Sequence, residues 1–176
     1  MENNNSKKLN NFAYIDGANL YASVTNAGWK IDFIKLRKWL GDKYKISKAY
    51  YFIGLIPKHK DLYKYLQEAG YTLIFKEVVY NCIGEPKGNC DADLVLQSVI
   101  DAYENSCDRQ VIITSDGDYA GLIKFLSGKN KLRVVLSPSN GKKCSILLKR
   151  INVPITYLEE VKDKIYFIKK KPPLRT

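Results

Sequence analysis

Several residue types that often carry catalysis are scarce in this chain. It has one histidine, His59, which lies in Pro57-Lys58-His59-Lys60 and far from every other motif. The four cysteines, at positions 82, 90, 107 and 144, include no Cys-x-x-Cys pair. A zinc site therefore has little support, because its ligands are usually closely spaced cysteines and histidines.

The sequence also lacks a long apolar run. No stretch reaches the ~18 residues that a membrane span needs, so we expect no span. Residues 1–10 are polar, without the apolar stretch of a signal peptide, and we interpret them as a disordered N-terminal segment. We expect a cytoplasmic protein with reduced thiols, although a disulfide between Cys82 and Cys90 stays open.

Acidic residues are outnumbered, with 18 Asp and Glu against 29 Lys and Arg and a net charge of +11. Such a surplus attracts polyanions, and we favour nucleic acid over a lysine surface that only confers solubility. Five of the acids gather in three short motifs, at 14–19, 87–93 and 114–119. The rest of the surface is then more positive than the total charge suggests.

Strand patterns alternate with helix patterns along the chain. The expected strands are 11–16, 48–55, 71–79, 110–114, 132–136 and 155–158, and the expected helices are 31–44, 58–69, 91–105, 119–127 and 145–150. This alternation predicts a three-layer α/β/α sandwich with a mainly parallel central sheet, of the Rossmann-like type. We expect one domain at 11–158, followed by a basic C-terminal appendage at 159–176.

Each of the three motifs falls where a strand ends or a helix begins. Asp16 ends the first strand, and Asp116 and Asp118 follow the fourth. Asp91 and Asp93 begin the helix that leads into the fourth strand. Open α/β sheets bind ligands outside the carboxyl ends of their strands, so adjacency of the first and fourth strands would bring the three motifs together.

Carboxylates gathered at one point repel each other unless a cation neutralises them. Oxygen ligands of this kind suit Mg²⁺ or Mn²⁺. We therefore predict a divalent metal site, whose ligands are Asp16, Asp91, Asp116 and Asp118 with Asp93 nearby. Helix capping is the alternative explanation for Asp16 and Asp91.

The same motifs contain groups that could bind a substrate phosphate. Asn19 can hydrogen-bond Asp16 or a phosphate, and Ser115 can hydrogen-bond a carboxylate or a phosphate. Lys87 precedes the second pair of acids and could reach a phosphate. Gly17 would permit a tight turn with positive φ, which lets the backbone approach a ligand closely.

The three motifs resemble the signature blocks of the NYN domain family of PIN-related proteins. They are Tyr14-Ile15-Asp16-Gly17-Ala18-Asn19-Leu20, Lys87-Gly88-Asn89-Cys90-Asp91-Ala92-Asp93-Leu94 and Thr114-Ser115-Asp116-Gly117-Asp118-Tyr119. The resemblance extends over about residues 11–158. It implies a PIN-like fold and a metal-dependent endoribonuclease, with the aspartates of the predicted metal site, Asp93 excepted, as the catalytic residues.

One position departs from the family pattern. Many relatives have a further acid about two turns after the position of Asp91, where this chain has Leu96-Gln97-Ser98. An RNA-binding or interaction module of the same fold without turnover is therefore the alternative hypothesis. A phosphatase-like enzyme with Asp16 as nucleophile is a third, but the first motif has no second acid two residues later and no glycine-rich phosphate loop follows the first strand.

A ribonuclease or an RNA-binding module also needs contacts to the RNA strand. The candidates for backbone contacts are Lys58, Lys60, Lys87, Lys142 and Lys143. The candidates for stacking on unpaired bases are Tyr21, Tyr80 and Tyr119, although most of the 13 tyrosines are expected to pack in the core. A homodimer is compatible with the sequence.

Overall fold

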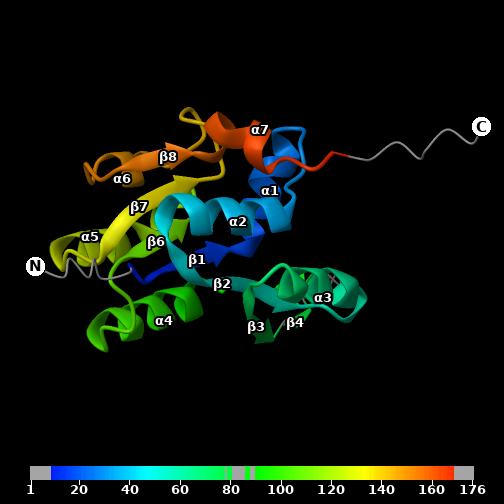
Figure 1. Cartoon of the computed structure of the whole chain (residues 1–176), viewed down its shortest axis with the longest axis horizontal. Coiled ribbons are helices and arrows are strands. Elements are labelled where there is room, and N and C mark those ends of the chain that lie inside the picture. Colours follow the sequence, from blue (N-terminus) through cyan, green and yellow to red (C-terminus); the bar gives the residue numbers. More distant parts are fainter. Residues whose placement is uncertain (1–8, 78, 81–85, 88–89, 169–176) are drawn as a thin grey trace, which may run out of the picture.

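The computed structural model describes residues 9–77, 79–80, 86–87 and 90–168. Its central sheet consists of β1 Asn11–Asp16, β2 Ile46–Leu55, β3 Thr72–Glu77, β6 Gln110–Ile113, β7 Leu132–Ser137 and β8 Ile155–Tyr157. All neighbouring strands are parallel, and their order is β3-β2-β1-β6-β7-β8 (Figure 1). The short strands β4 Val79–Tyr80 and β5 Pro86–Lys87 form a separate antiparallel pair.

Helices cover both faces of the central sheet (Figure 1). One face packs against α1 Gly17–Asn26, α2 Phe33–Tyr44, α3 Lys60–Glu68 and α7 Lys162–Ile165. The other face packs against α4 Asp91–Tyr103, α5 Ala120–Gly128 and α6 Ile146–Lys149. Single 3₁₀ turns complete the chain at η1 Pro57–His59, η2 Gly117–Tyr119 and η3 Leu158–Val161. The protein is therefore the three-layer α/β/α sandwich expected from the sequence.

The middle of the sheet is fully buried, and β1 shows why. All six of its residues are buried, and successive side chains point to opposite faces. Ala13 and Ile15 enter the core under α1 and α2, whereas Phe12 and Tyr14 enter the core under α4 and α5. A strand with helices on both faces has no solvent-exposed side, which explains the nearly continuous apolar sequence of β1.

Helix α1 is not among the helices predicted from the sequence. Its sequence begins with glycine and contains asparagine, serine and threonine, which are weak helix formers. Tertiary packing compensates, because Leu20 and Val24 lie four residues apart on one side of the helix and are both buried in the core. The helix begins directly after Asp16, so β1 and α1 together form the first strand–helix corner.

The C-terminal segment differs from the expected appendage. Ile165 is fully buried, and the backbone nitrogen of Asp32 donates a hydrogen bond of 2.9 Å to its carbonyl. The backbone nitrogen of Phe167 likewise donates to the carbonyl of Lys30 over 2.9 Å. Residues 159–168 thus pack on the start of α2, because apolar Val161 and Ile165 recur between the charged residues. Residues 169–176 lie outside the described part.

Within the described residues, no helix is both long enough and apolar enough to cross a membrane. Cys90 is a free thiol, and Cys82, its candidate disulfide partner, lies outside those residues.

Candidate functional site

Three carboxylates from two distant motifs converge at the carboxyl edge of the sheet. Asp91 is the first residue of α4, Asp116 is the N-cap of η2 and Asp118 lies within η2. Each offers one carboxylate oxygen, and these three oxygens lie within 4.8 Å of one another. The topology brings the three acidic motifs to this edge. β1 pairs directly with β6, and α4 returns the chain to the amino end of β6. The expected adjacency of the first and fourth strands of the sheet is confirmed.

Asp16 lies beside this group, at the end of β1. Together with Asp91 and Asp116 it lines a cavity of about 360 Å³. Its Oδ1 accepts a hydrogen bond of 3.0 Å from the backbone nitrogen of Asn19, so it also caps α1. Its Oδ2 accepts from Thr114 Oγ1 over 3.4 Å. The helix cap predicted for Asp16 is therefore confirmed, and its place beside Asp91 and Asp116 is compatible with the metal-ligand prediction.

The surroundings of Asp16 disfavour its charge. Burial is the main cause that raises the pKa of its carboxyl group above the ordinary value of 3.8, and the charges of Asp91 and Asp116 raise it further. The hydrogen bonds from Asn19 and Thr114 oppose this shift only in part. A bound cation would offset the repulsion between these carboxylates and favour the charged form of Asp16. This is the behaviour expected of a metal ligand.

Asp91 is not the N-cap of α4, and its carboxylate is oriented by a tyrosine. Residue Cys90 is the N-cap of α4 and makes no side-chain cap bond, whereas Asp91 Oδ1 accepts a hydrogen bond of 2.5 Å from the phenol of Tyr119. Burial, followed by the charge of Asp16, raises the pKa of Tyr119 far above its ordinary range, so the phenol stays a donor. Tyr119 is one of the predicted stacking residues, but its side chain is 1% exposed and cannot meet a base.

The other two stacking candidates separate clearly. Tyr21, on α1, is 67% exposed and is available to a ligand. The side chain of Tyr80 lies outside the described part of the chain.

Asn19 and Ser115 join α1 to the end of β6. Asn19 Oδ1 accepts hydrogen bonds of 2.9 Å from both the backbone nitrogen and the hydroxyl of Ser115. The hydroxyl of Ser115 also lies 3.1 Å from that of Ser139, which in turn lies 2.9 Å from that of Ser23. These bonds hold the first and third motifs in register, and Asn19 also lines the acidic cavity.

The remaining predicted residues lie at different distances from the carboxylate group. Asp93 is outside it, because its Oδ2 is 3.1 Å from Lys76 Nζ, and this ion pair neutralises its charge. The backbone nitrogens of Lys142 and Lys143 both donate to Asn140 Oδ1 over 3.2 Å, which leaves the two side chains exposed. The side chain of Lys87 lies outside the described residues.

Close packing, not backbone freedom, explains Gly17. The expectation of a positive φ at Gly17 is wrong, since the residue begins α1 and its φ is not positive. A Cβ at this position would lie 2.6 Å from the carbonyl oxygen of Phe52 and would collide with the ring of Tyr51. The glycine therefore lets α1 start against β2, which sets the position of Asp16.

The donor set fits a hard divalent cation. The three converging ligand atoms are all carboxylate oxygens, which Mg²⁺ and Mn²⁺ favour. Cys90 also lines the cavity, but burial, followed by the charges of Asp93, Asp16 and Asp91, raises the pKa of its thiol to about 11. In the metal-free protein this thiol is therefore protonated and a weak nucleophile, so Cys90 does not suggest cysteine catalysis.

The residue that replaces the family's further acid is used inside α4. Gln97 Nε2 donates a hydrogen bond of 3.2 Å to Asp101 Oδ2, which also accepts a bond of 2.7 Å from the phenol of Tyr14. Gln97 is not among the residues that line the acidic cavity. Its amide therefore helps to satisfy a buried carboxylate at the far end of the helix.

Comparisons with known proteins agree with this geometry. A solved structure of a protein of unknown function from Vibrio parahaemolyticus RIMD 2210633 is 17% identical, with a TM-score of 0.74 over 95% of this chain and 100% of that chain. At this identity the likeness shows the shared fold. No curated protein matches this sequence. The family model of the NYN domain matches residues 12–152, which include all three acidic motifs, and the chain therefore belongs to the NYN domain family.

Proposed function

We propose that this protein is a metal-dependent endoribonuclease that hydrolyses phosphodiester bonds of RNA. The observation that carries the proposal is the convergence of Asp91, Asp116 and Asp118, whose oxygens lie within 4.8 Å of one another. Membership of the NYN domain family, which suggests a PIN-like nuclease fold, supports the same reading.

The acidic cavity has the composition of a metal centre. Asp91, Asp116 and Asp118 would hold one Mg²⁺ or Mn²⁺ ion. Asp16, at the end of the neighbouring strand β1, would supply a further carboxylate to the site. A bound ion of this type lowers the pKa of water and stabilises negative charge on a phosphodiester. The chain's own part is to fix these oxygens: Tyr119 orients Asp91, while Asn19 and Thr114 hold Asp16.

Charge outside the cavity favours a polyanionic substrate. The net charge is +11, although several acids are concentrated at the site. Lys142 and Lys143 extend from the turn that follows β7, close in the chain to Ser139, whose hydroxyl lies 3.1 Å from that of Ser115. We assign them to the substrate backbone, where lysines contribute affinity without sequence preference. Lys87 stays a candidate of the same kind.

The test is an incubation of purified protein with end-labelled RNA in Mn²⁺, in Mg²⁺ or in EDTA. We expect cleavage in the presence of either metal, none in EDTA, and loss of at least about 100-fold in rate for Asp116→Asn. Asp42→Asn is the matched control, since Asp42 is an exposed acid of α2 that pairs with Lys38. Cleavage that persists in EDTA or in Asp116→Asn would contradict the proposal.

The same incubations, with mononucleotides as a second substrate, distinguish the two rival functions. Intact RNA in a shifted band under all metal conditions would indicate a binding module, the function that the Gln97 substitution leaves open. Phosphate release from mononucleotides, with intact RNA, would indicate a phosphatase. The latter is disfavoured because Asp16 is only 7% exposed and both of its oxygens already accept hydrogen bonds.

A further inference from the structure

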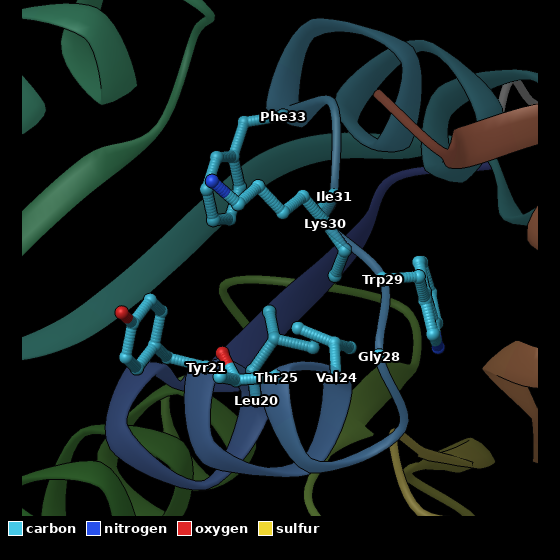
Figure 2. Close-up of a pocket in the computed structure, with 9 residues that line it drawn as sticks. All are labelled: Leu20, Tyr21, Val24, Thr25, Gly28, Trp29, Lys30, Ile31 and Phe33. Atoms are coloured by element: carbon cyan, nitrogen blue, oxygen red, sulfur yellow. The ribbon is translucent and has the colours of Figure 1, made fainter. Parts of the chain in front are cut away.

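A second cavity lies beside α1 and takes no part in the proposed chemistry. It has a volume of about 440 Å³, within the range of small-molecule sites. It lies between α1 and the connector that leads into α2, and Figure 2 draws its lining residues. We call it the α1–α2 groove and define it by Leu20, Tyr21, Val24, Thr25, Gly28, Trp29, Lys30, Ile31 and Phe33.

The floor and one wall of the groove are rigid and apolar. Leu20, Val24 and Ile31 belong to the core cluster and are at most 8% exposed. Phe33 forms the wall at the start of α2, and its ring packs edge-on against Tyr51, Tyr65 and Tyr71 at centroid distances of 5.7, 6.2 and 6.1 Å. This wall is therefore preformed, which lowers the entropic cost of binding a flat apolar group.

The opposite wall is an exposed aromatic ring. Tyr21 rises from α1, across the groove from Phe33 at the start of α2, and its side chain is 67% exposed (Figure 2). When an exposed aromatic ring stacks on a ligand, it gives up few contacts within the protein and gains apolar contact with the ligand. The groove thus offers one fixed ring and one adjustable ring to a planar ligand.

The charge of the lining selects the ligand further. Among the residues that the structure describes, Lys30 is the one charged residue that lines the groove, and no acid of that part of the chain lines it. Figure 2 shows the Lys30 side chain extending toward Phe33. An apolar slot with aromatic walls and a lysine at its mouth matches a flat ring that is attached to an anionic backbone, which is the chemistry of a nucleotide.

Helix α1 connects this groove to the acidic cavity. Ala18 and Ala22 of α1 line the acidic cavity, whereas Tyr21 and Thr25 of the same helix line the groove. Ala18, Tyr21, Ala22 and Thr25 are all exposed, so α1 presents one continuous surface between the two sites. Small side chains on this surface leave room for a strand to cross the helix.

We propose that the α1–α2 groove binds one unpaired base of the RNA strand whose phosphodiester lies at the acidic cavity, with Tyr21 stacking on the base. This inference rests on the proposed function for the identity of the strand. It makes single-stranded RNA the substrate class, because a base held in a duplex cannot enter the groove.

The test measures binding without cleavage. A fluorescein-labelled single-stranded RNA of 12 nucleotides is titrated with the full chain in EDTA, and anisotropy gives Kd. We expect Tyr21→Ala to weaken binding by about 5- to 100-fold, the range for loss of one stacked base, and Tyr21→Phe to stay within about twofold. Tyr103→Ala is the matched control, because Tyr103 is 66% exposed and lies at the C-terminal end of α4 on the other face of the sheet.

A second readout identifies the base contact itself. An RNA with one abasic nucleotide, placed at each position in turn, should lose affinity for the wild type at one position. At that position Tyr21→Ala should cause no additional loss, because the two changes remove the same interaction. 2-Aminopurine placed there should be quenched on binding to the wild type and not to Tyr21→Ala.

The outcomes distinguish the two proposals. Kd values for Tyr21→Ala equal to those for Tyr103→Ala, or fully additive effects of Tyr21→Ala and every abasic position, would overturn the groove proposal. Cleavage of RNA with such a result would leave the proposed function intact. Conversely, Tyr21-dependent binding without metal-dependent cleavage would keep the groove as a base site and reject the nuclease.

Discussion

The phenol of Tyr119 donates a hydrogen bond of 2.5 Å to Asp91 Oδ1, although the two residues are 28 positions apart in the sequence. This bond joins η2 to the first turn of α4, and so it links two of the three acidic motifs directly. Because Tyr119 is buried, the bond is shielded from water and holds the Asp91 carboxylate at one orientation.

Tyr119→Phe should therefore weaken metal binding without removing a ligand. Loss of a partner that orients a metal ligand typically costs 10–100-fold in affinity, and we expect about 10-fold for Mn²⁺. Isothermal titration calorimetry with Mn²⁺ measures this effect independently of any activity. The maximal rate of cleavage at saturating Mn²⁺ should fall much less than the rate at low Mn²⁺.

Tyr14→Phe is the matched control for this prediction. Tyr14 is also buried, and its phenol donates a bond of 2.7 Å to Asp101, another acid of α4. Both variants should lower the free energy of unfolding by about 1–3 kcal/mol, because each removes one buried hydrogen bond to a carboxylate of α4. Equal Mn²⁺ affinities of the two variants would show that Tyr119 acts on stability alone.

The charge of Asp16 should destabilise the metal-free protein at neutral pH. Burial, together with Asp91 and Asp116, raises the pKa of Asp16 above 3.8, so the folded protein binds this proton more tightly than the unfolded chain does. The unfolding free energy contributed by Asp16 therefore falls as pH rises from 3.8 through the raised pKa, and it stays low at pH 7.

Asp16→Asn should accordingly raise the thermal midpoint at pH 7 in EDTA, and the gain should shrink as the pH falls toward 3.8. Saturating Mn²⁺ should reverse the order, because the wild type gains a stabilising ligand that the variant binds more weakly. Thermal scans at several pH values, with and without Mn²⁺, provide the measurement. A gain that does not depend on pH would contradict the electrostatic origin.

The position of the site can be predicted from the sequence, because open α/β sheets bind ligands at the carboxyl ends of their strands. Asp16 and Asp116 both follow short apolar strands, and parallel strands present their carboxyl ends at one edge. The adjacency of β1 and β6 then decides that the two meet. Only this last step required the three-dimensional structure.

Other features could not be predicted because they arise from tertiary packing. Helix α1 has weak intrinsic propensity and is held by Leu20 and Val24 in the core. Tyr119 looks like any of the 13 tyrosines, and no local pattern signals its bond to Asp91. The burial of Ile165 likewise depends on α2, which lies more than a hundred residues earlier in the sequence.

Gly17→Ala should be destabilising although alanine is the better helix former. Its Cβ would meet the Tyr51 ring and lie 2.6 Å from the Phe52 carbonyl oxygen, so α1 must move away from β2. We expect a loss of about 1–3 kcal/mol, measured by urea denaturation, together with weaker Mn²⁺ binding as Asp16 shifts.

Gly121→Ala provides the opposite case. Gly121 lies in α5, and a Cβ there would meet nothing within 4 Å. This variant should gain about 0.4–1 kcal/mol and keep the affinity for Mn²⁺. A neutral or stabilising result for Gly17→Ala would show that α1 is not set by contact with β2.

Lys142 and Lys143 should contribute to RNA affinity through charge alone. Log Kd for single-stranded RNA depends linearly on log salt concentration, with a slope of about 0.7 for each neutralised phosphate. The double variant Lys142→Ala, Lys143→Ala should therefore reduce this slope by about 1.4 in the background of Asp116→Asn, which prevents cleavage. Affinity should fall by a similar factor for every RNA sequence.

Two lysines elsewhere give the matched control for this pair. Lys124 lies on α5 and Lys129 is the residue that ends it, and the chain then enters the amino end of β7, away from the acidic cavity. Their double replacement by alanine changes the net charge by the same amount. If the control reduces the salt slope as much as the Lys142 and Lys143 pair does, the attraction is a property of the whole surface and the turn after β7 does not contact the RNA strand.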